Sequence, residues 1–131
     1  MPGMKADDAL VARWRETLCL HARTVCELDR ALQPHGLGAS DFEVLDVLAS
    51  DQAEDGGCAF RVQELIGRVH LSQSALSRLV GRLEREGLVS RAMCSDDRRG
   101  VRVTLTEAGR RRHEEALPAQ RAVLARMLPV T

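Results

Sequence analysis

Mostly apolar side chains recur at spacings of three and four residues through the N-terminal quarter of the chain, the pattern of one face of an α-helix. These positions are Val11, Trp14, Leu18, His21, Val25, Leu28 and Leu32. Because the spacing alternates between three and four, it also resembles the seam along which two helices pack. Pro34 and two glycines end the pattern. The sequence therefore predicts a long first helix over 7–33 with an apolar seam.

Shorter helices follow. Ser40 and Glu43 have the spacing of a capping box, which predicts a second helix from Ser40 to about Ser50. The polar stretch DQAEDGGC at 51–58 predicts a loop. Apolar spacing then predicts a short third helix over 62–68.

The segment 71–87, LSQSALSRLVGRLEREG, predicts a fourth helix with two distinct faces. Ser72 is a suitable N-cap and Gly87 a suitable terminator. The inward stripe consists of Leu76, Leu79, Val80 and Leu83. Three residues, 69–71, separate this helix from the third, and two short helices joined by such a turn form a helix-turn-helix.

The opposite face of the fourth helix carries small or hydrogen-bonding side chains near its start, which allow a helix to enter a groove closely. They are Gln73, Ser74, Ser77 and Arg78. Arg82 and Arg85, further along, are expected to pair within the chain or to lie at the rim.

Alternating residues then predict a β-hairpin. LVSRAMC at 88–94 and VRVTL at 101–105 flank the turn SDDRRG. Thr106 begins a last helix, irregular at Pro118, that ends near Leu128. The predicted fold is mainly α (α+β): a winged helix-turn-helix with a two-stranded wing and flanking helices.

The formal net charge of the 131 residues is zero, but the charges are unevenly distributed. Residues 1–60 contain five Lys/Arg and eleven Asp/Glu, whereas residues 78–112 contain ten Arg and five acids. A basic segment is often only a solvated face. Here it coincides with the helix that has the small polar face, which favours a polyanionic partner.

Other classes of protein are disfavoured by the sequence. No apolar run reaches the length of a membrane span, and no secretory signal opens the chain. The four cysteines lack CxxC spacing, which predicts reduced thiols in a cytoplasmic protein. No nucleophile–base pair, phosphate loop or paired catalytic carboxylate is apparent, so neither an enzyme nor a cofactor is expected.

Two adjoining segments, VQELIGRVHLSQSALSRLVGRLEREGLVSR and SDDRRGVRVTLTEAG, resemble the MarR family of bacterial transcriptional regulators. The resemblance covers about residues 10–125. It implies a homodimeric repressor on a near-palindromic double-stranded DNA operator, with each recognition helix in a major groove and each wing along a minor groove. In many members, a small anionic or phenolic ligand or thiol oxidation releases the DNA.

The resemblance also implies how the chain is divided. Residues 1–131 form a single domain, in which 40–105 are the DNA-binding core and 8–34 and 106–128 are dimerisation helices. Many members continue into a further helix, so the expected dimer rests on the first and last helices, with help from Val123, Leu124 and Met127. At His70 the family often has glycine, so His70 is expected either to adopt a positive φ or to shift the turn.

Matching the family's DNA contacts gives a recognition-helix set and a wing set. The predicted residues are Ser72, Gln73, Ser74, Ser77 and Arg78 on the helix, and Asp96, Arg98 and Arg99 in the wing. Gln73 suits adenine, and Arg78 suits guanine or a phosphate, with a salt bridge to the hairpin as the alternative. Arg98 suits a narrow minor groove, oriented by Asp96.

The family's effector pocket lies between the dimerisation helices and the winged helix, where Trp14, Arg15 and His21 are the candidate ligand-binding residues. Packing in the dimer seam is the alternative role for Trp14 and His21. Cys19 matches the region of the reactive thiol in peroxide-sensing members, although the tyrosines that support that thiol are missing here. A redox-sensing repressor using Cys19 and a metal-responsive regulator therefore remain alternatives, although no metal-ligand spacing is evident.

Overall fold

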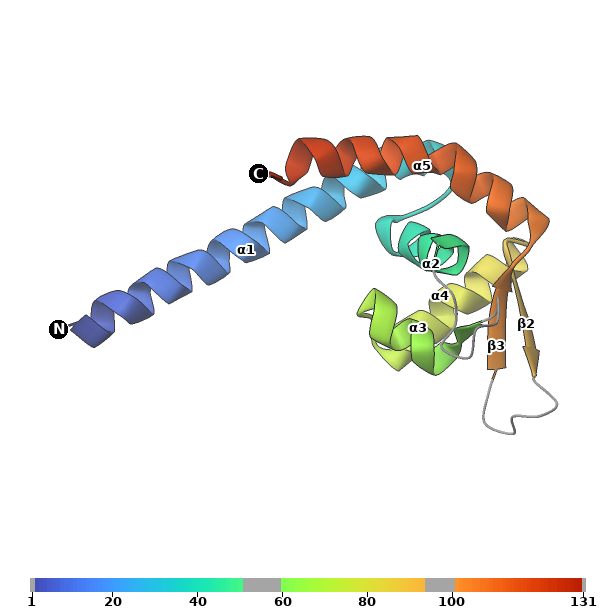
Figure 1. Cartoon of the computed structure of the whole chain (residues 1–131), viewed down its shortest axis with the longest axis horizontal. Coiled ribbons are helices and arrows are strands. Elements are labelled where there is room, and N and C mark those ends of the chain that lie inside the picture. Colours follow the sequence, from blue (N-terminus) through green and yellow to red (C-terminus); the bar gives the residue numbers. More distant parts are fainter. Residues whose placement is uncertain (1, 51–59, 94–100, 131) are drawn as a thin grey trace.

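Two long helices lie side by side and cover a unit of short helices and a small sheet (Figure 1). The computed structural model describes residues 2–50, 60–93 and 101–130. The elements are α1 (Pro2–Leu32), the 3₁₀ helix η1 (Gln33–His35), α2 (Ala39–Ser50), β1 (Phe60–Arg61), α3 (Val62–Val69), α4 (Gln73–Arg85), β2 (Val89–Met93), β3 (Val101–Leu105) and α5 (Glu107–Met127). This order confirms the predicted winged helix-turn-helix with flanking helices.

The core lies where α2, α3, α4 and the sheet meet beneath α5 and the C-terminal part of α1. Its largest fully buried side chains are Phe42, Phe60, Leu32, Leu45, Leu65, Leu76, Leu83, Leu88, Val44, Val80, Val89 and Val103. The sheet is antiparallel in the order β1–β3–β2, and Val103 pairs with Phe60 on one side and Arg91 on the other. The two-residue strand β1 is too short for an alternating pattern, and the sequence did not predict it.

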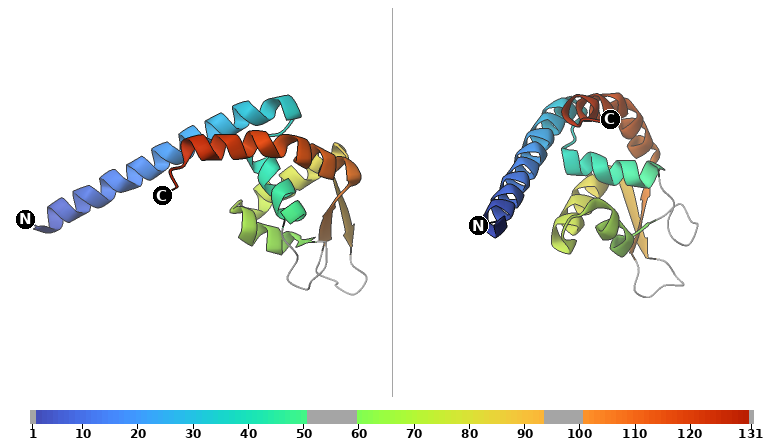
Figure 2. Two further views of the ribbon diagram at one scale, coloured as in Figure 1. Left: turned by 45° about the horizontal axis from the view of Figure 1, so that its top comes forward. Right: turned by 60° about the vertical axis from the view of Figure 1, so that its left-hand side comes forward.

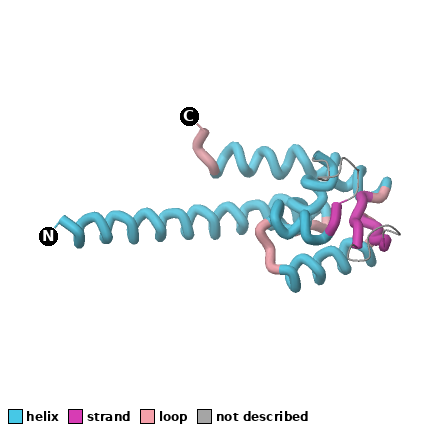
Figure 3. Tube along the Cα trace, turned by 60° about the horizontal axis from the view of Figure 1, so that its bottom comes forward, coloured by secondary structure: helices cyan, strands magenta, loops and turns pink. Residues whose placement is uncertain are grey.

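The N-terminal part of α1 projects beyond the rest of the chain as a free arm (Figure 2). Leu10 and Trp14 are 63% and 61% exposed, and Leu18 is 46% exposed. Toward its C-terminus, α1 runs antiparallel to α5 (Figure 3), and Arg126 of α5 donates to Glu27 of α1 at 3.1 Å. The arm therefore presents apolar side chains that this chain does not cover.

Only the N-terminal part of the predicted seam on α1 is exposed on the surface. Leu28 and Leu32 are 9% and 0% exposed and belong to the core of the single chain. Val123, expected to help a dimer, is also buried in this core. These three expectations were wrong because α5 folds back over the end of α1, a long-range contact that helical periodicity does not reveal.

The capping box predicted at Ser40 and Glu43 is also wrong. Helix α2 begins at Ala39, and the carboxylate of Asp41 accepts a hydrogen bond from the Gly38 amide at 2.7 Å. Asp29 of α1 accepts from the Ala39 amide at 2.8 Å. The cap thus depends partly on a carboxylate from another helix.

Helix α5 is joined to α2 by a partly buried polar cluster. The Nε2 atom of His113 lies 2.7 Å from Oδ1 of Asp46, and Arg121 donates to both oxygens of that carboxylate at 3.3 Å. The His113 ring stacks on Phe42 with 5.2 Å between centroids. Burial raises the pKa of neighbouring Glu43, Asp46 adds to the rise, and Arg121 opposes it. These contacts fix α5 on the winged core.

The first turn of α5 is fixed by Thr106 and Gly109. The Thr106 hydroxyl accepts from the Gly109 amide at 3.0 Å and donates to the Gly87 carbonyl at 2.6 Å. Further along, α5 passes through Pro118 and bends along its length (Figure 1), as expected where a proline removes a helical hydrogen bond.

We predict that Gly109→Ala destabilises the protein by roughly 1–3 kcal/mol or more, because a Cβ there would overlap the backbone carbonyl of Leu88. The matched control is Gly67→Ala in α3, where, apart from the backbone of its own helix and its chain neighbours, no described atom lies within 4 Å of the added Cβ. That change should stabilise the protein by about 0.5–1 kcal/mol through helix propensity. Urea unfolding of the three proteins measures both effects. Equal stabilities of Gly109→Ala and wild type would contradict the close approach.

Candidate nucleic-acid interface

The turn between α3 and α4 adopts one of the two conformations expected from the sequence. His70 ends α3 with φ 57° and ψ 40°, in the left-handed region that few non-glycine residues adopt. Ser72 then caps α4, since its Oγ accepts from the Ala75 amide at 3.2 Å. The N-cap prediction is confirmed, and of the two alternatives for His70 the structure has the positive φ.

The buried stripe of α4 determines which face of the helix is left outside. Its members, Leu76, Leu79, Val80 and Leu83, are each at most 8% exposed. Because these residues pack into the core, the small polar residues on the other side face solvent.

The polar residues at the N-terminal end of α4 lie together around a surface hollow. Ser72, Gln73, Ser74 and Ser77 line this hollow of about 510 Å³, and all four are exposed. Arg78 is exposed one residue further on and makes no ion pair within 2–50, 60–93 and 101–130. The structure therefore brings together the predicted recognition-helix set. The alternative salt bridge of Arg78 is absent among the described residues, which do not include the turn of the hairpin at 94–100.

A second hollow continues along α4 to the hairpin and is strongly basic. Its volume is about 710 Å³, and its charged lining consists of Arg78, Arg82, Arg85 and Arg91. Two of these are held by carboxylates: Arg82 by Asp41 of α2, and Arg91 by Glu84 of α4. The intramolecular role expected for Arg82 is thereby confirmed.

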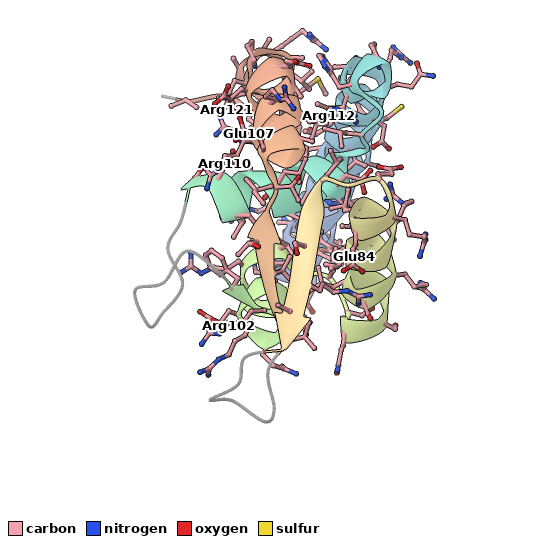
Figure 4. All side chains as sticks on the ribbon, turned by 90° about the vertical axis from the view of Figure 1, so that its right-hand side faces the viewer. Glu84, Arg102, Glu107, Arg110, Arg112 and Arg121 are labelled. Atoms are coloured by element: carbon pink, nitrogen blue, oxygen red, sulfur yellow. The ribbon has the colours of Figure 1, made fainter. Side chains whose placement is uncertain are left out.

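The pair between Glu84 and Arg91 ties the base of the hairpin to the recognition helix. The Arg91 Nε donates to Glu84 Oε1 at 3.0 Å, and Figure 4 shows Glu84 between α4 and β2. This hydrogen bond, together with the charge of Arg91, lowers the pKa of Glu84. Arg102 of β3 lies on the other side of the hairpin (Figure 4).

The N-terminal end of α4 and the open ends of β2 and β3 lie on the side of the molecule away from α5 (Figure 1). A helix N-terminus carries a partial positive charge and free amides that favour anions. The predicted wing residues Asp96, Arg98 and Arg99, and also Cys58 and Cys94, lie outside the described residues.

The candidate effector residues lie on α1 and not on the recognition helix. Trp14, Arg15 and His21 are all exposed on the arm of α1. Cys19, on the same arm, and Cys26 are exposed free thiols.

No group of three or more His, Cys, Asp or Glu side chains suited to a metal ion occurs in the described part of the chain. Every helix in that part is too short or too polar to span a lipid bilayer.

A helix-turn-helix whose second helix is followed directly by a β-hairpin is a winged helix, a class of double-stranded DNA-binding domain. Residues 35–100, half of the chain, match the model of the MarR family. The chain belongs to the MarR family of transcriptional regulators.

Known proteins similar to this chain extend over nearly its whole length. The HTH-type transcriptional repressor MdtR of Bacillus subtilis (strain 168) is 27% identical over 126 residues, which cover 95% of this chain and 77% of MdtR. AbsC, a MarR family transcriptional regulator from Streptomyces coelicolor, has 31% identity and a TM-score of 0.80, covering 92% of this chain and 79% of AbsC. These relatives are transcriptional regulators and not enzymes, as the sequence predicted.

One similar structure was solved with DNA bound. Sco3205, a MarR family transcriptional regulator from Streptomyces coelicolor in complex with DNA, has 28% identity and a TM-score of 0.80. The match covers 94% of this chain and 74% of Sco3205.

Proposed function

We propose that the protein is a homodimeric repressor that binds a near-palindromic operator through α4 and the wing, and that a small aromatic anion releases it. The observation that carries this proposal is the exposed polar face at the start of α4, formed by Ser72, Gln73, Ser74, Ser77 and Arg78.

The chemistry of this face suits the edges of base pairs in a major groove. An exposed glutamine can bond adenine through two hydrogen bonds, and an exposed arginine can bond guanine or a phosphate. The two serines nearest the helix start, Ser72 and Ser74, suit phosphate contacts beside the free amides of the helix N-terminus. In the proposed complex, Arg98 and Arg99 of the wing follow the minor groove, with Asp96 orienting Arg98.

Dimerisation is proposed through a second copy of the arm. Leu10, Val11, Trp14 and Leu18 are between 42% and 63% exposed at helical spacing on one face. Monomeric proteins rarely leave such a continuous apolar stripe in water. Two copies joined in this way present two α4 helices, as a near-palindromic site requires.

A small-molecule effector is proposed near the arm, with Trp14, Arg15 and His21 as candidate contacts. An aromatic ring and a guanidinium suit an aromatic carboxylate, and salicylate is a simple probe of this class. The ligand can release DNA only if it binds the DNA-incompetent arrangement of the dimer more tightly than the competent one. Cys19 provides the alternative, a thiol with Arg15 and Arg23 each one helical turn away.

We predict that Gln73→Ala weakens binding to the operator by roughly 1–3 kcal/mol, because one bidentate base contact is lost. Binding to a scrambled duplex of equal length should change little. The operator is first recovered by selection from a pool of randomised duplexes, and affinities are measured by fluorescence anisotropy at fixed salt. Gln33→Ala, an exposed glutamine in η1, is the matched control. An equal loss on both duplexes would contradict base reading by Gln73.

We predict that Leu18→Glu weakens the dimer about tenfold or more, because it places a charge within the proposed apolar interface. The matched control is Ala9→Glu, an exposed position on the opposite face of α1 that should leave the dimer intact. Sedimentation velocity over a concentration series measures the association. A wild-type monomer at tens of micromolar would overturn the proposed dimer.

We predict that millimolar salicylate lowers operator affinity and changes the fluorescence of Trp14, the single tryptophan of the chain. In Trp14→Phe the release should weaken, since the aromatic contact is altered. If salicylate has no effect, while peroxide releases wild type and Cys26→Ser but not Cys19→Ser, regulation occurs through the Cys19 thiol instead.

A further inference from the structure

One buried carboxylate joins the start of α2 to α4. The side chain of Asp41, at the start of α2, is 7% exposed, and both of its oxygens are engaged. One accepts from the Gly38 amide at 2.7 Å, and the other accepts from the Arg82 guanidinium of α4. This hydrogen bond to Asp41 raises the pKa of Arg82.

The start of α2 is also hydrogen-bonded to α1. Asp29 of α1 accepts from the Ala39 amide at 2.8 Å. Gly38 lies between the two carboxylates, since a Cβ there would be 3.4 Å from Asp29 Oδ1 and 3.5 Å from Asp41 Oδ2. A continuous set of hydrogen bonds therefore connects the recognition helix, through the start of α2, to the long helix that carries the arm.

This connection reaches α4 at Arg82, near the C-terminal end of the helix, whereas the residues proposed to contact bases lie at its N-terminal end. Arg82 lies nine residues beyond Gln73, which is about 13 Å along a helix axis. A tilt of about 10° around Arg82 would move Gln73 by about 2 Å, which exceeds the range of roughly 0.5 Å over which hydrogen-bond distances vary. At this position, a small change in the tilt of α4 has a large effect on whether Gln73 can contact a base.

We infer that Asp41 and Arg82 are positioning residues that fix the angle of α4 relative to α1, and thereby the separation of the two recognition helices in the dimer. The inference rests on the proposed function, since it concerns a dimer that reads two half-sites. The pair touches no base in this arrangement and acts through the placement of Gln73 and its neighbours.

Loss of the pair should leave the winged core folded. The apolar stripe Leu76, Leu79, Val80 and Leu83 holds α4 in the core independently of Arg82. The substitution Asp41→Asn keeps the size of the side chain and an acceptor for the Gly38 amide, while it removes the charge that holds the guanidinium. It therefore loosens the angle of α4 with little change in packing.

The test compares Asp41→Asn with Glu84→Gln. Both changes replace a carboxylate by its amide and deprive an arginine in the basic hollow of its partner, but Glu84 pairs with Arg91 of β2 inside the winged core. Thermal melts first establish that each variant is folded. Affinities are then measured for the selected full site, for a single half-site, and for full sites with one base pair added or removed between the halves.

For Asp41→Asn we expect at least about a fivefold loss on the full site, in the range typical of coupling between sites. Half-site affinity should stay within twofold of wild type, and the preference for the native spacing should decrease. Glu84→Gln should keep the spacing preference of wild type. If Asp41→Asn does not fold, Arg82→Lys carries the same test, because lysine keeps the charge but not the planar fork of donors.

Equal losses on the full site and the half-site would overturn the inference, since the pair would then support each winged helix by itself. Unchanged spacing preference in a folded variant would overturn it as well. A wild-type protein that binds full site and half-site equally well would instead refute the proposed dimeric reading, so the two failures are distinguishable.

Discussion

The orientation of the recognition helix depends on one constraint, the burial of the apolar stripe of α4. Leu76, Leu79, Val80 and Leu83 are in contact with the core and are at most 8% exposed. At about 25 cal/mol per Å² of apolar surface, each such side chain stabilises the packed arrangement by roughly 1.5–3 kcal/mol. With the stripe inside, Gln73, Ser74, Ser77 and Arg78 can face only outward.

Burial of the stripe leaves the ends of α4 to be fixed by polar contacts. At the first end, Ser72 and the left-handed His70 determine where the helix begins. At the other end, Arg82 joins α2, and Glu84 holds Arg91 of the hairpin. The chain then returns to α5 with Thr106 bonded to the Gly87 carbonyl. Recognition helix, hairpin and last helix are thus connected through short polar contacts around an apolar centre.

Features set by neighbours along the chain were predictable from the sequence, and those set by distant partners were not. The stripe of α4, its cap at Ser72 and the alternation of β2 and β3 are local, and each was confirmed. The predicted cap of α2 was wrong for two reasons: the Gly38 amide bonds Asp41, a local contact that the prediction missed, and the Ala39 amide bonds Asp29, ten residues away. Leu28 and Leu32 are buried because α5 packs against them, and no pattern within α1 reveals that contact. The wing residues Asp96, Arg98 and Arg99 stay predictions, as do the DNA contacts of the α4 face.

Some of the unevenly distributed charges form ion pairs within the fold, and others remain available to a binding partner. Acidic groups of α1 and α2 pair with arginines from later helices: Glu27 with Arg126, Asp41 with Arg82, and Asp46 with Arg121. These pairs join the two halves of the sequence, so opposite charges in the two halves are a consequence of how they pack. Arg78 and Arg85 differ, since neither has an ion pair in the described part of the chain. Part of the positive charge that is not paired within the described residues therefore lies on the exposed face of α4, beside the residues proposed to read bases.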